Sequence, residues 1–223
     1  MNPGVMLIPI LVLFAYLLGS IPFSQVITSW RTGLNLREVG EGNAGSRNVW
    51  HVVGPEWGLA AFALDAFKGV GALEVARAAR APEVVALLCG VIALLGHQFP
   101  IFLRSHGGKG LAPGLGALLV VTPLSSVGGL AVLGLVYLLT RDFNPSVAAG
   151  IIAMIVLPVL LREPLWVAGY VLALALLAAL KKLLDRAHEQ EVWARRPWAG
   201  TARPGFTEDG GSDKAPAPDG QAH

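Results

Sequence analysis

Long stretches without a charged side chain constrain this sequence more than any other feature. Residues 5–27, 84–103, 111–140, 144–161 and 165–180 contain no Asp, Glu, Lys or Arg. About 20 apolar helical residues, each rising 1.5 Å, span the hydrocarbon core of a bilayer. Of the 223 residues, 54% are apolar and only 14% are charged, whereas soluble domains carry about 25% charged residues. We therefore expect an integral membrane protein.

These stretches predict an all-α fold with about seven transmembrane helices. The run 111–140 is too long for one span, and Thr122-Pro123 is the natural place to divide it. Residues 57–76 are counted as a span although three charged residues lie in them. The apolar runs are continuous and lack the alternation of a barrel strand. The predicted segments are residues 5–27, 57–76, 84–103, 111–121, 124–140, 145–161 and 164–181.

The positions of Lys and Arg predict the orientation, because cytoplasmic loops are enriched in these residues. Thirteen of them fall on the side of the C-terminal tail, and only Arg77, Arg80 and Arg162 fall on the other. We therefore expect a multi-pass protein of the cell (plasma) membrane, with its N-terminus outside and its C-terminus in the cytoplasm. Residues 1–204 are predicted to form one membrane-embedded domain. Residues 205–223, rich in Gly, Pro, Asp and Ser, are predicted to form a disordered tail.

Composition narrows the function classes. Lys and Arg number 17 against 15 Asp and Glu, a net charge of +2, which excludes a strongly basic nucleic-acid binder. The single cysteine excludes a disulfide scaffold and a Cys-rich metal site. No ligand cluster indicates a metal, no motif requires a cofactor, and the pattern does not fix the oligomeric state.

Polar and glycine-rich sequence is concentrated in three predicted cytoplasmic stretches, residues 37–51, 96–110 and 185–200. Loops on one face of a small helical bundle can converge, so we expect them to form one site. Residues 107–110 read Gly-Gly-Lys-Gly, in which glycines let backbone N–H groups approach an anion and lysine adds a positive charge. This favours anion binding over a merely flexible turn, although the spacing of a Walker A loop is absent.

Residues 40–45 read G-x-G-x-x-G, and Asp65 follows Gly45 by 20 residues, as in a dinucleotide-binding fingerprint. That fingerprint needs a preceding buried strand in a βαβ unit, whereas the preceding element here is a predicted membrane span. We therefore set the dinucleotide interpretation aside. Asp65 and Lys68 lie three residues apart on one helix face and can pair, either as a structural ion pair or as a support beneath the loop site. His97 is open to a packing role as well as a functional one.

Five motifs occur in order along the chain. They are Gly19-Ser20-Ile21-Pro22-Phe23, Gly-Asn-x-Gly…Asn within residues 42–48, Asp65-x-x-Lys68-Gly69, Gly96-His97-x-Phe99-Pro100-x-Phe102-Leu103 and Gly107-Gly108-Lys109-Gly110. Together they resemble the bacterial acyl-phosphate:glycerol-3-phosphate acyltransferase family (PlsY), from about residue 16 to 145 and more weakly from 185 to 201. The resemblance implies transfer of a fatty acyl group from acyl phosphate to the 1-hydroxyl of glycerol 3-phosphate. The product is lysophosphatidic acid, for phospholipid biosynthesis.

The resemblance also implies partners and residue roles. The partners are glycerol 3-phosphate, acyl phosphate and membrane lipids, with the active site facing the cytoplasm. The implied catalytic residues are Asn43, Asn48, His97 and His188. The residues that would bind the substrate phosphate are Gly107, Gly108, Lys109 and Gly110. Arg47 is added to this set because of its position in the first loop, and not because it matches a family motif. The supporting residues are Gly45, His51, Asp65 and Lys68.

The first loop departs from the family pattern Ser-Gly-Asn-x-Gly-Ala-Thr-Asn-x-x-Arg. Glu41 replaces the Ser, Arg47 the Thr and His51 the final Arg. A carboxylate at position 41 brings negative charge toward a phosphate substrate. Arg47 and His51 lie four residues apart, so on a helix they share a face and Arg47 can supply the missing guanidinium. Two alternatives stay open, a non-catalytic or altered-acceptor relative that binds phosphate or lipid, and a small transporter.

Overall fold

A computed structural model describes residues 3–104 and 106–195, and within these ranges it contains helices and turns but no strand. The elements are α1 (Pro3–Ser20), α2 (Phe23–Thr32), α3 (Ser46–Val52), α4 (Pro55–Ala78), α5 (Glu83–Gln98), the 3₁₀ turn η1 (Ile101–Leu103), α6 (Leu111–Val121), α7 (Pro123–Thr140), α8 (Phe143–Leu160) and α9 (Leu165–Ala194). The predicted all-α fold is confirmed for this part of the chain. The predicted tail, residues 205–223, lies outside the described residues.

Each predicted segment falls on helix. Among the described residues, five stretches are long and apolar enough to cross a membrane, namely α1 continued by α2, α5 continued by η1, and α7, α8 and α9. The other two predicted spans are α6, which has only 11 residues, and α4, which carries the charged pair Asp65 and Lys68. Length and apolar character alone therefore support five spans. The placement of α4 and α6 in the membrane depends on their packing against the other helices.

The division of the long apolar run lies where the sequence places it. Helix α6 ends at Val121 and α7 begins at Pro123. Between them Thr122 has φ −141° and ψ 71°, outside the helical region. The proline ring disfavours a helical conformation at the preceding residue, while proline itself fits well in the first turn of the next helix.

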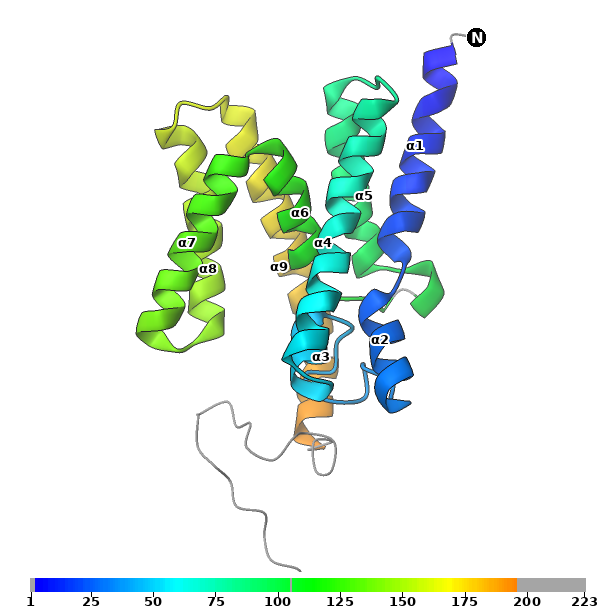
Figure 1. Cartoon of the computed structure of the whole chain (residues 1–223), viewed down its shortest axis with the longest axis vertical. Helices are drawn as coiled ribbons and strands as arrows, with labels where there is room; N and C mark the ends of the chain where they lie inside the picture. Colours follow the sequence, from blue (N-terminus) through cyan, green and yellow to red (C-terminus); the bar gives the residue numbers. More distant parts are fainter. Residues whose placement is uncertain (1–2, 105, 196–223) are drawn as a thin grey trace, which may run out of the picture.

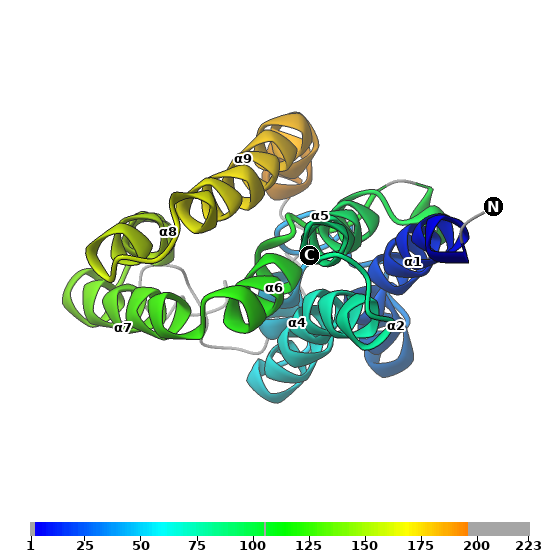
Figure 2. The same cartoon turned by 90° about the horizontal axis from the view of Figure 1, so that it is seen from above.

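Helix α4 packs against α1, α5 and α6, which lie beside it in Figure 2. Its crossing with α6 depends on two glycines. A Cβ atom at Gly69 would lie 2.0 Å from the carbonyl oxygen of Pro113, and one at Gly116 would lie 1.9 Å from that of Ala66. Small residues allow helices to approach this closely, and such contacts drive association in lipid. They explain how a helix with buried charges is held inside the bundle.

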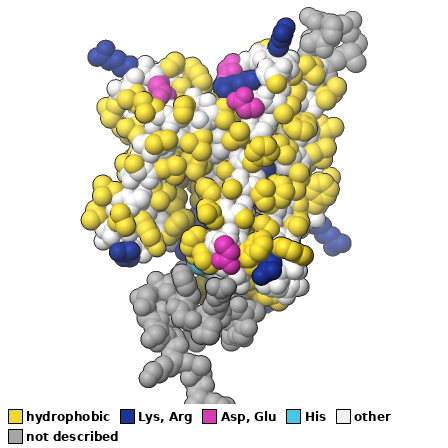
Figure 3. Space-filling view, in the orientation of Figure 1, with side chains coloured by type: hydrophobic (Ala, Val, Ile, Leu, Met, Phe, Trp, Pro, Cys, Tyr) yellow, Lys and Arg dark blue, Asp and Glu magenta, His cyan; other side chains and the backbone are white. Residues whose placement is uncertain are grey.

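Helices α7 and α8 form a hairpin at one side of the molecule, and α1 lies at the other (Figure 2). The hairpin joins the rest through the contacts of α7 with α6 and of α8 with α9. On the face shown in Figure 3, apolar side chains cover the middle and most charged side chains lie toward the two ends. This distribution suits a molecule whose central band faces lipid.

The connections that the sequence assigns to the cytoplasm lie at one end of the bundle. The α2–α3 loop, the α5–α6 loop and the C-terminal part of α9 are at the lower end in Figure 1. The α4–α5 and α8–α9 turns are at the upper end. The alternation follows from the helix order, and it brings the three polar stretches together.

Candidate active site

Three segments that are far apart in the sequence meet at the lower end of the bundle (Figure 1). Nζ of Lys109, in the α5–α6 loop, lies 3.0 Å from Oε1 of Glu189 on α9. Nδ2 of Asn43, in the α2–α3 loop, donates to the same Glu189 oxygen at 3.2 Å. Nε2 of His188 lies 3.1 Å from the carbonyl oxygen of Arg37. The predicted convergence of the three stretches is confirmed by these contacts.

Asn48 organises the α2–α3 loop from within. Its side chain is completely buried, and Nδ2 lies within 3.0 Å of the carbonyl oxygens of Leu36, Val39 and Asn43. Its Oδ1 accepts a hydrogen bond from the backbone N–H of Glu41 at 2.8 Å. A buried amide with both ends satisfied fixes the backbone around it. Asn48 thus fixes the conformation of the loop from a buried position beneath its surface residues.

Asn43 and Gly45 shape the turn that leads into α3. The Asn43 side chain is buried, and its Oδ1 accepts from the backbone N–H of Gly45 at 3.0 Å. Gly45 is the residue that precedes α3. The Asn43 amide group thus closes the turn with its oxygen and reaches α9 with its nitrogen.

Glu41, the residue that replaces the family serine, is paired. Its Oε1 lies 3.1 Å from Nε of Arg47 and 3.1 Å from Nδ1 of His51. Arg47 and His51 belong to the same short helix, so the prediction that they share a face is confirmed. The Arg47 guanidinium also lies over the ring of Phe143, 4.5 Å from its centroid. Arg47 therefore offsets the charge of Glu41 in this structure.

The surroundings of Glu41 favour its ionised form. Burial raises the pKa of this carboxyl group, but the hydrogen bond from His51 and the charge of Arg47 outweigh burial and bring the pKa below its usual value. Lys109 adds to the same effect from the α5–α6 loop. The negative charge introduced at position 41 is thus retained and matched by nearby cations.

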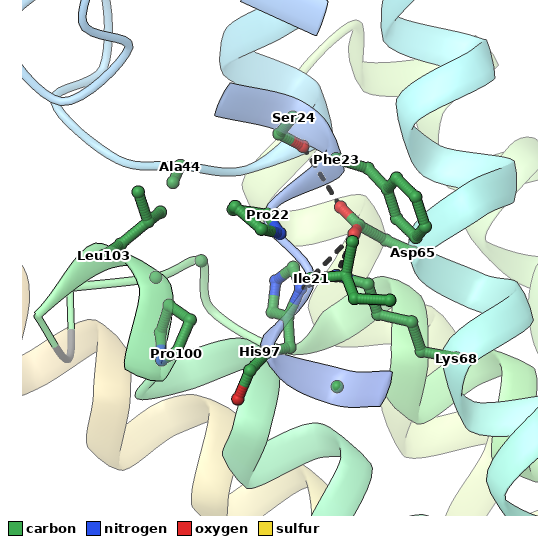
Figure 4. A pocket seen from close by; sticks show the side chains of 14 residues that line it. Ile21, Pro22, Phe23, Ser24, Ala44, Asp65, Lys68, His97, Pro100 and Leu103 are labelled. Atoms are coloured by element: carbon green, nitrogen blue, oxygen red, sulfur yellow. Dashed lines mark hydrogen bonds and ion pairs between the residues drawn. The ribbon is translucent and has the colours of Figure 1, made fainter. Parts of the chain in front are cut away.

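A second polar cluster lies deeper, beneath the loops (Figure 4). Nζ of Lys68 lies 2.6 Å from Oδ1 of Asp65, which confirms the predicted pairing. The Ser24 hydroxyl donates to Oδ2 of Asp65 at 3.1 Å. Nδ1 of His97 lies 3.4 Å from Nζ of Lys68 and 3.5 Å from Oδ1 of Asp65. All four residues are buried, so a network from α2, α4 and α5 connects the bundle interior to the loop site.

The glycine-rich loop passes directly over His97. The backbone N–H of Gly108 donates to the carbonyl oxygen of His97 at 3.2 Å, and that of Gly107 donates to the carbonyl oxygen of Gln98 at 3.1 Å. A Cβ atom at Gly108 would lie 2.4 Å from Nε2 of His97, so this position has no room for a side chain. The loop then enters the N-terminus of α6 through Gly110, at φ 88°. The positive end of a helix dipole favours an anion there.

A small pocket lies between the two clusters, with a cavity volume of about 10 Å³. It is lined by the turn between α1 and α2, by Ala44, and by Gly107 and Gly108 (Figure 4). Lys68 and His97 lie at its polar side. Of the predicted site residues, this pocket is lined by Asp65, Lys68, His97, Gly107 and Gly108, whereas the Asn43–His51 group reaches it through Ala44.

Three residues of the site were not predicted as members. Glu189 contacts both Lys109 and Asn43, and Ser24 contacts Asp65. Gln98 is buried, and its Nε2 lies 2.9 Å from the carbonyl oxygen of Lys109. An amide directly after His97 in an apolar helix was the available indication for Gln98. Glu189 and Ser24 carry no such indication, because their importance comes from contacts across the bundle.

The chain was compared with known families and proteins. The family model described as glycerol-3-phosphate acyltransferase matches residues 9–190. The glycerol-3-phosphate acyltransferase of Myxococcus xanthus is 42% identical over 149 residues, which cover 65% of this chain and 76% of that protein. The protein of the same description from Thermus thermophilus is 38% identical over 167 residues, covering 74% of this chain and 82% of its own.

Two solved structures share the fold. The crystal structure of PlsY, an integral membrane glycerol 3-phosphate acyltransferase, in its glycerol 3-phosphate form has a TM-score of 0.72 and 28% identity to this chain. The match covers 88% of this chain and 94% of that one. Its lysophosphatidic acid form gives a TM-score of 0.70 at 27% identity, with the same coverage. The prediction of an all-α integral membrane protein is confirmed by these likenesses.

Proposed function

This chain belongs to the glycerol-3-phosphate acyltransferase family, and we infer that it is a membrane enzyme that acylates glycerol 3-phosphate in phospholipid synthesis. We propose in addition that acyl phosphate is the donor and that the 1-hydroxyl of glycerol 3-phosphate is the acceptor, giving lysophosphatidic acid. We place the active site at the cytoplasmic face of the plasma membrane.

The chemistry of these substrates fits the residues at the lower end of the bundle. An acyl phosphate is an activated mixed anhydride with a good leaving group, so positioning and charge stabilisation supply much of the rate. Both substrates carry phosphate, which requires cations and N–H donors. Lys109 and the N-terminus of α6 supply them from one segment, and the Asn43 amide group supplies them from the α2–α3 loop. The acyl chain can stay in the bilayer while the head groups react.

The observation that carries this proposal is that Lys109 and Asn43 meet at Glu189, next to the Gly107–Gly108 backbone, which lines one pocket together with buried His97. In a chain without that convergence, the glycine-rich loop would be only a connection between helices. We assign the substrate phosphate to Lys109 and its loop. We assign the reacting centre to the pocket side of His97.

A second candidate, an acceptor other than glycerol 3-phosphate, is favoured by one specific observation. The two loop cations considered for the substrate phosphate are both paired with carboxylates, Arg47 with Glu41 and Lys109 with Glu189. A phosphate group must compete with these carboxylates for the cations. An acceptor with less negative charge would meet less repulsion at this site.

The test is acyl transfer by the purified full chain in detergent, with labelled glycerol 3-phosphate and either palmitoyl phosphate or palmitoyl-CoA. We expect labelled lysophosphatidic acid with palmitoyl phosphate alone. Product with palmitoyl-CoA alone would overturn the proposed donor. No product with either donor, from protein that unfolds cooperatively on heating, would overturn glycerol 3-phosphate as the acceptor.

Matched lysine variants locate the site in the same assay. Lys109→Ala is expected to raise the KM for glycerol 3-phosphate and to lower kcat/KM by about tenfold or more, because a charge-assisted hydrogen bond to phosphate is lost. Lys182→Ala removes the same charge from an exposed position on α9 and is expected to leave the kinetics unchanged. Equal losses in the two variants would contradict the assignment of Lys109 to the phosphate.

A further inference from the structure

Electron-rich groups surround the Lys68 ammonium on three sides (Figure 4). Its Nζ lies 2.6 Å from Oδ1 of Asp65, 3.4 Å from Nδ1 of His97 and 5.1 Å from the centroid of the Phe23 ring. The side chain is 1% exposed. A carboxylate, an imidazole nitrogen and an aromatic face are the partners expected of a charged ammonium. Lys68 thus acts as a donor toward His97.

The donor on one side of an imidazole determines which nitrogen carries the proton. An ammonium has donors and no acceptor, so Nδ1 of His97 meets Lys68 favourably only through its lone pair. The neutral ring then carries its proton on Nε2.

Asp65 offers the opposite assignment, in which Nδ1–H would donate to Oδ1 and Nε2 would be a base. The distance from Nδ1 to Oδ1 is 3.5 Å, whereas Lys68 is 2.6 Å from the same oxygen. The other oxygen of Asp65 accepts from Ser24 at 3.1 Å. Oδ1 of Asp65 is thus ion-paired with Lys68, which lies nearer to it than Nδ1 of His97 does, and Oδ2 is hydrogen-bonded to Ser24. The Lys68 ammonium is also within 3.4 Å of Nδ1 of His97.

The other ring nitrogen of His97 faces the glycine-rich loop and the pocket. The position of a Cβ at Gly108 is 2.4 Å from Nε2, and Gly107, Gly108 and His97 all line the same pocket. Within residues 3–104 and 106–195, no hydrogen bond to Nε2 is formed. An N–H group on Nε2 could therefore donate to a molecule bound against the glycine-rich loop.

We propose that Lys68 fixes the tautomer of His97, so that Nε2–H is a permanent hydrogen-bond donor to a phosphate oxygen of the substrate held at Gly107 and Gly108. The inference rests on the proposed function for the identity of the substrate, while the tautomer is a property of the protein alone. His97 acts as a neutral donor and takes no proton from the acceptor hydroxyl. Lys68 is a positioning residue that acts through His97.

The tautomer is tested without any substrate. The full chain, labelled with ¹⁵N at histidine and reconstituted in lipid nanodiscs, is examined by ¹⁵N–¹H correlation spectroscopy, and the His97 signals are assigned by their absence in His97→Gln. We expect a protonated Nε2 and an unprotonated Nδ1 at neutral pH. Lys68→Met is expected to abolish the single-tautomer pattern, and Lys68→Arg to restore it. A protonated Nδ1 in the unchanged protein would overturn the proposal.

The donor role is tested by two amides that imitate different ring nitrogens. The amide nitrogen of Gln reaches the position of Nε2, whereas that of Asn reaches only the position of Nδ1. Loss of one donor to developing charge costs about 100- to 1,000-fold in kcat, and we expect that loss in His97→Asn and His97→Leu. His97→Gln is expected to keep kcat within about tenfold of the unchanged enzyme. Equal loss in Gln and Asn variants would contradict a donor at Nε2.

The two lines of measurement separate the inference from the proposed function. If the spectra show the expected tautomer and no acyl transfer to glycerol 3-phosphate occurs, the proposed acceptor is wrong and the tautomer stands. If transfer occurs and the spectra show a protonated Nδ1, the inference is wrong and the proposed function stands. Variants that fail to fold are recognised by their thermal unfolding, and the spectra of the unchanged protein still decide the tautomer.

Discussion

The carboxylate of Glu189 lies 3.0 Å from the ammonium of Lys109, so the last helix neutralises the lysine of the glycine-rich loop. Both side chains are about one-fifth exposed, and a partly exposed ion pair can be exchanged for another anion at modest cost. The same carboxylate accepts from Asn43. Glu189 therefore connects two of the three segments through the position at which we place the substrate phosphate.

Removing the charge of Glu189 is expected to free Lys109. For Glu189→Gln we predict a KM for glycerol 3-phosphate about two- to fivefold lower, because the competing ion pair contributes up to about 1 kcal/mol. Steady-state kinetics with palmitoyl phosphate measure the change. Glu83→Gln removes the same charge at the other end of the bundle and should leave KM unchanged. A higher KM in Glu189→Gln would show that the carboxylate supports the site instead of competing for it.

The paired Glu41 carboxylate should make stability depend on pH. Its pKa is lowered in the folded protein, so its contribution is present above the unfolded pKa and is lost as the pH falls through the folded value. We expect Glu41→Gln to lower the free energy of unfolding by about 1–3 kcal/mol near neutral pH, and the difference from the unchanged protein to shrink below about pH 4. Thermal unfolding at both pH values measures it. A difference that grows with acidity would contradict the sign.

Asn48 should matter for stability more than its position on the short helix α3 implies. In Asn48→Ala, the three carbonyl oxygens and one N–H that it serves would lose their partner inside the protein. We expect a loss of about 2–4 kcal/mol in the free energy of unfolding together with a loss of activity. Asn35→Ala, at an exposed position of the α2–α3 loop, is the control and should cost less than about 1 kcal/mol. Similar losses would contradict the organising role.

Gly108 should be intolerant of the smallest side chain. In Gly108→Ala the added carbon would collide with Nε2 of His97, and the loop or the imidazole must move. We predict a fall in kcat/KM of about tenfold or more with little change in thermal stability, because misplacement of reacting groups by about 1 Å can cost 100-fold. Gly134→Ala adds the same carbon where nothing lies within 4 Å, and should leave activity unchanged. An active Gly108→Ala enzyme would contradict the close approach.

The orientation can be checked by cysteine accessibility. The chain has a single cysteine, Cys89, which is buried, so a Cys89→Ala background accepts single cysteines at exposed positions. Glu38→Cys and His106→Cys should react with a membrane-impermeant reagent only after the cytoplasmic side is opened. Glu83→Cys should react from outside the cell. Labelling of positions 38 and 106 from opposite sides would contradict one shared site.

Much of the fold could be predicted because a chain in lipid must satisfy its backbone hydrogen bonds internally, which favours helices. The division at Thr122-Pro123 and the pairing of Asp65 with Lys68 follow from local rules, the restriction before proline and the spacing of a helix face. The role of Glu189 could not be predicted in the same way. Its partners lie 80 residues away on Lys109 and 146 residues away on Asn43, and no local pattern encodes such a distance.

The partners of Glu41 and Arg47 likewise could not be predicted from the sequence of the first loop alone. Sequence alone identified a carboxylate where the family has a hydroxyl and predicted a face shared by Arg47 and His51. It placed Arg47 with the substrate phosphate. The tertiary structure shows the guanidinium held by Glu41 and by the ring of Phe143 on α8, a partner from a helix that no spacing in the first loop indicates.

By itself, the sequence determined that lipid surrounds this protein, which segments become helices, and which family motifs are present. These properties follow from patterns over a few residues, namely uncharged runs of spanning length and a proline or glycine at a fixed position. Only the tertiary structure decided which charges meet. Pairing between side chains depends on distances of a few ångströms, and those distances are set by how α4, α5, α9 and the loops pack together. The proton on His97 belongs to this second kind of information, since it depends on Lys68 from another helix.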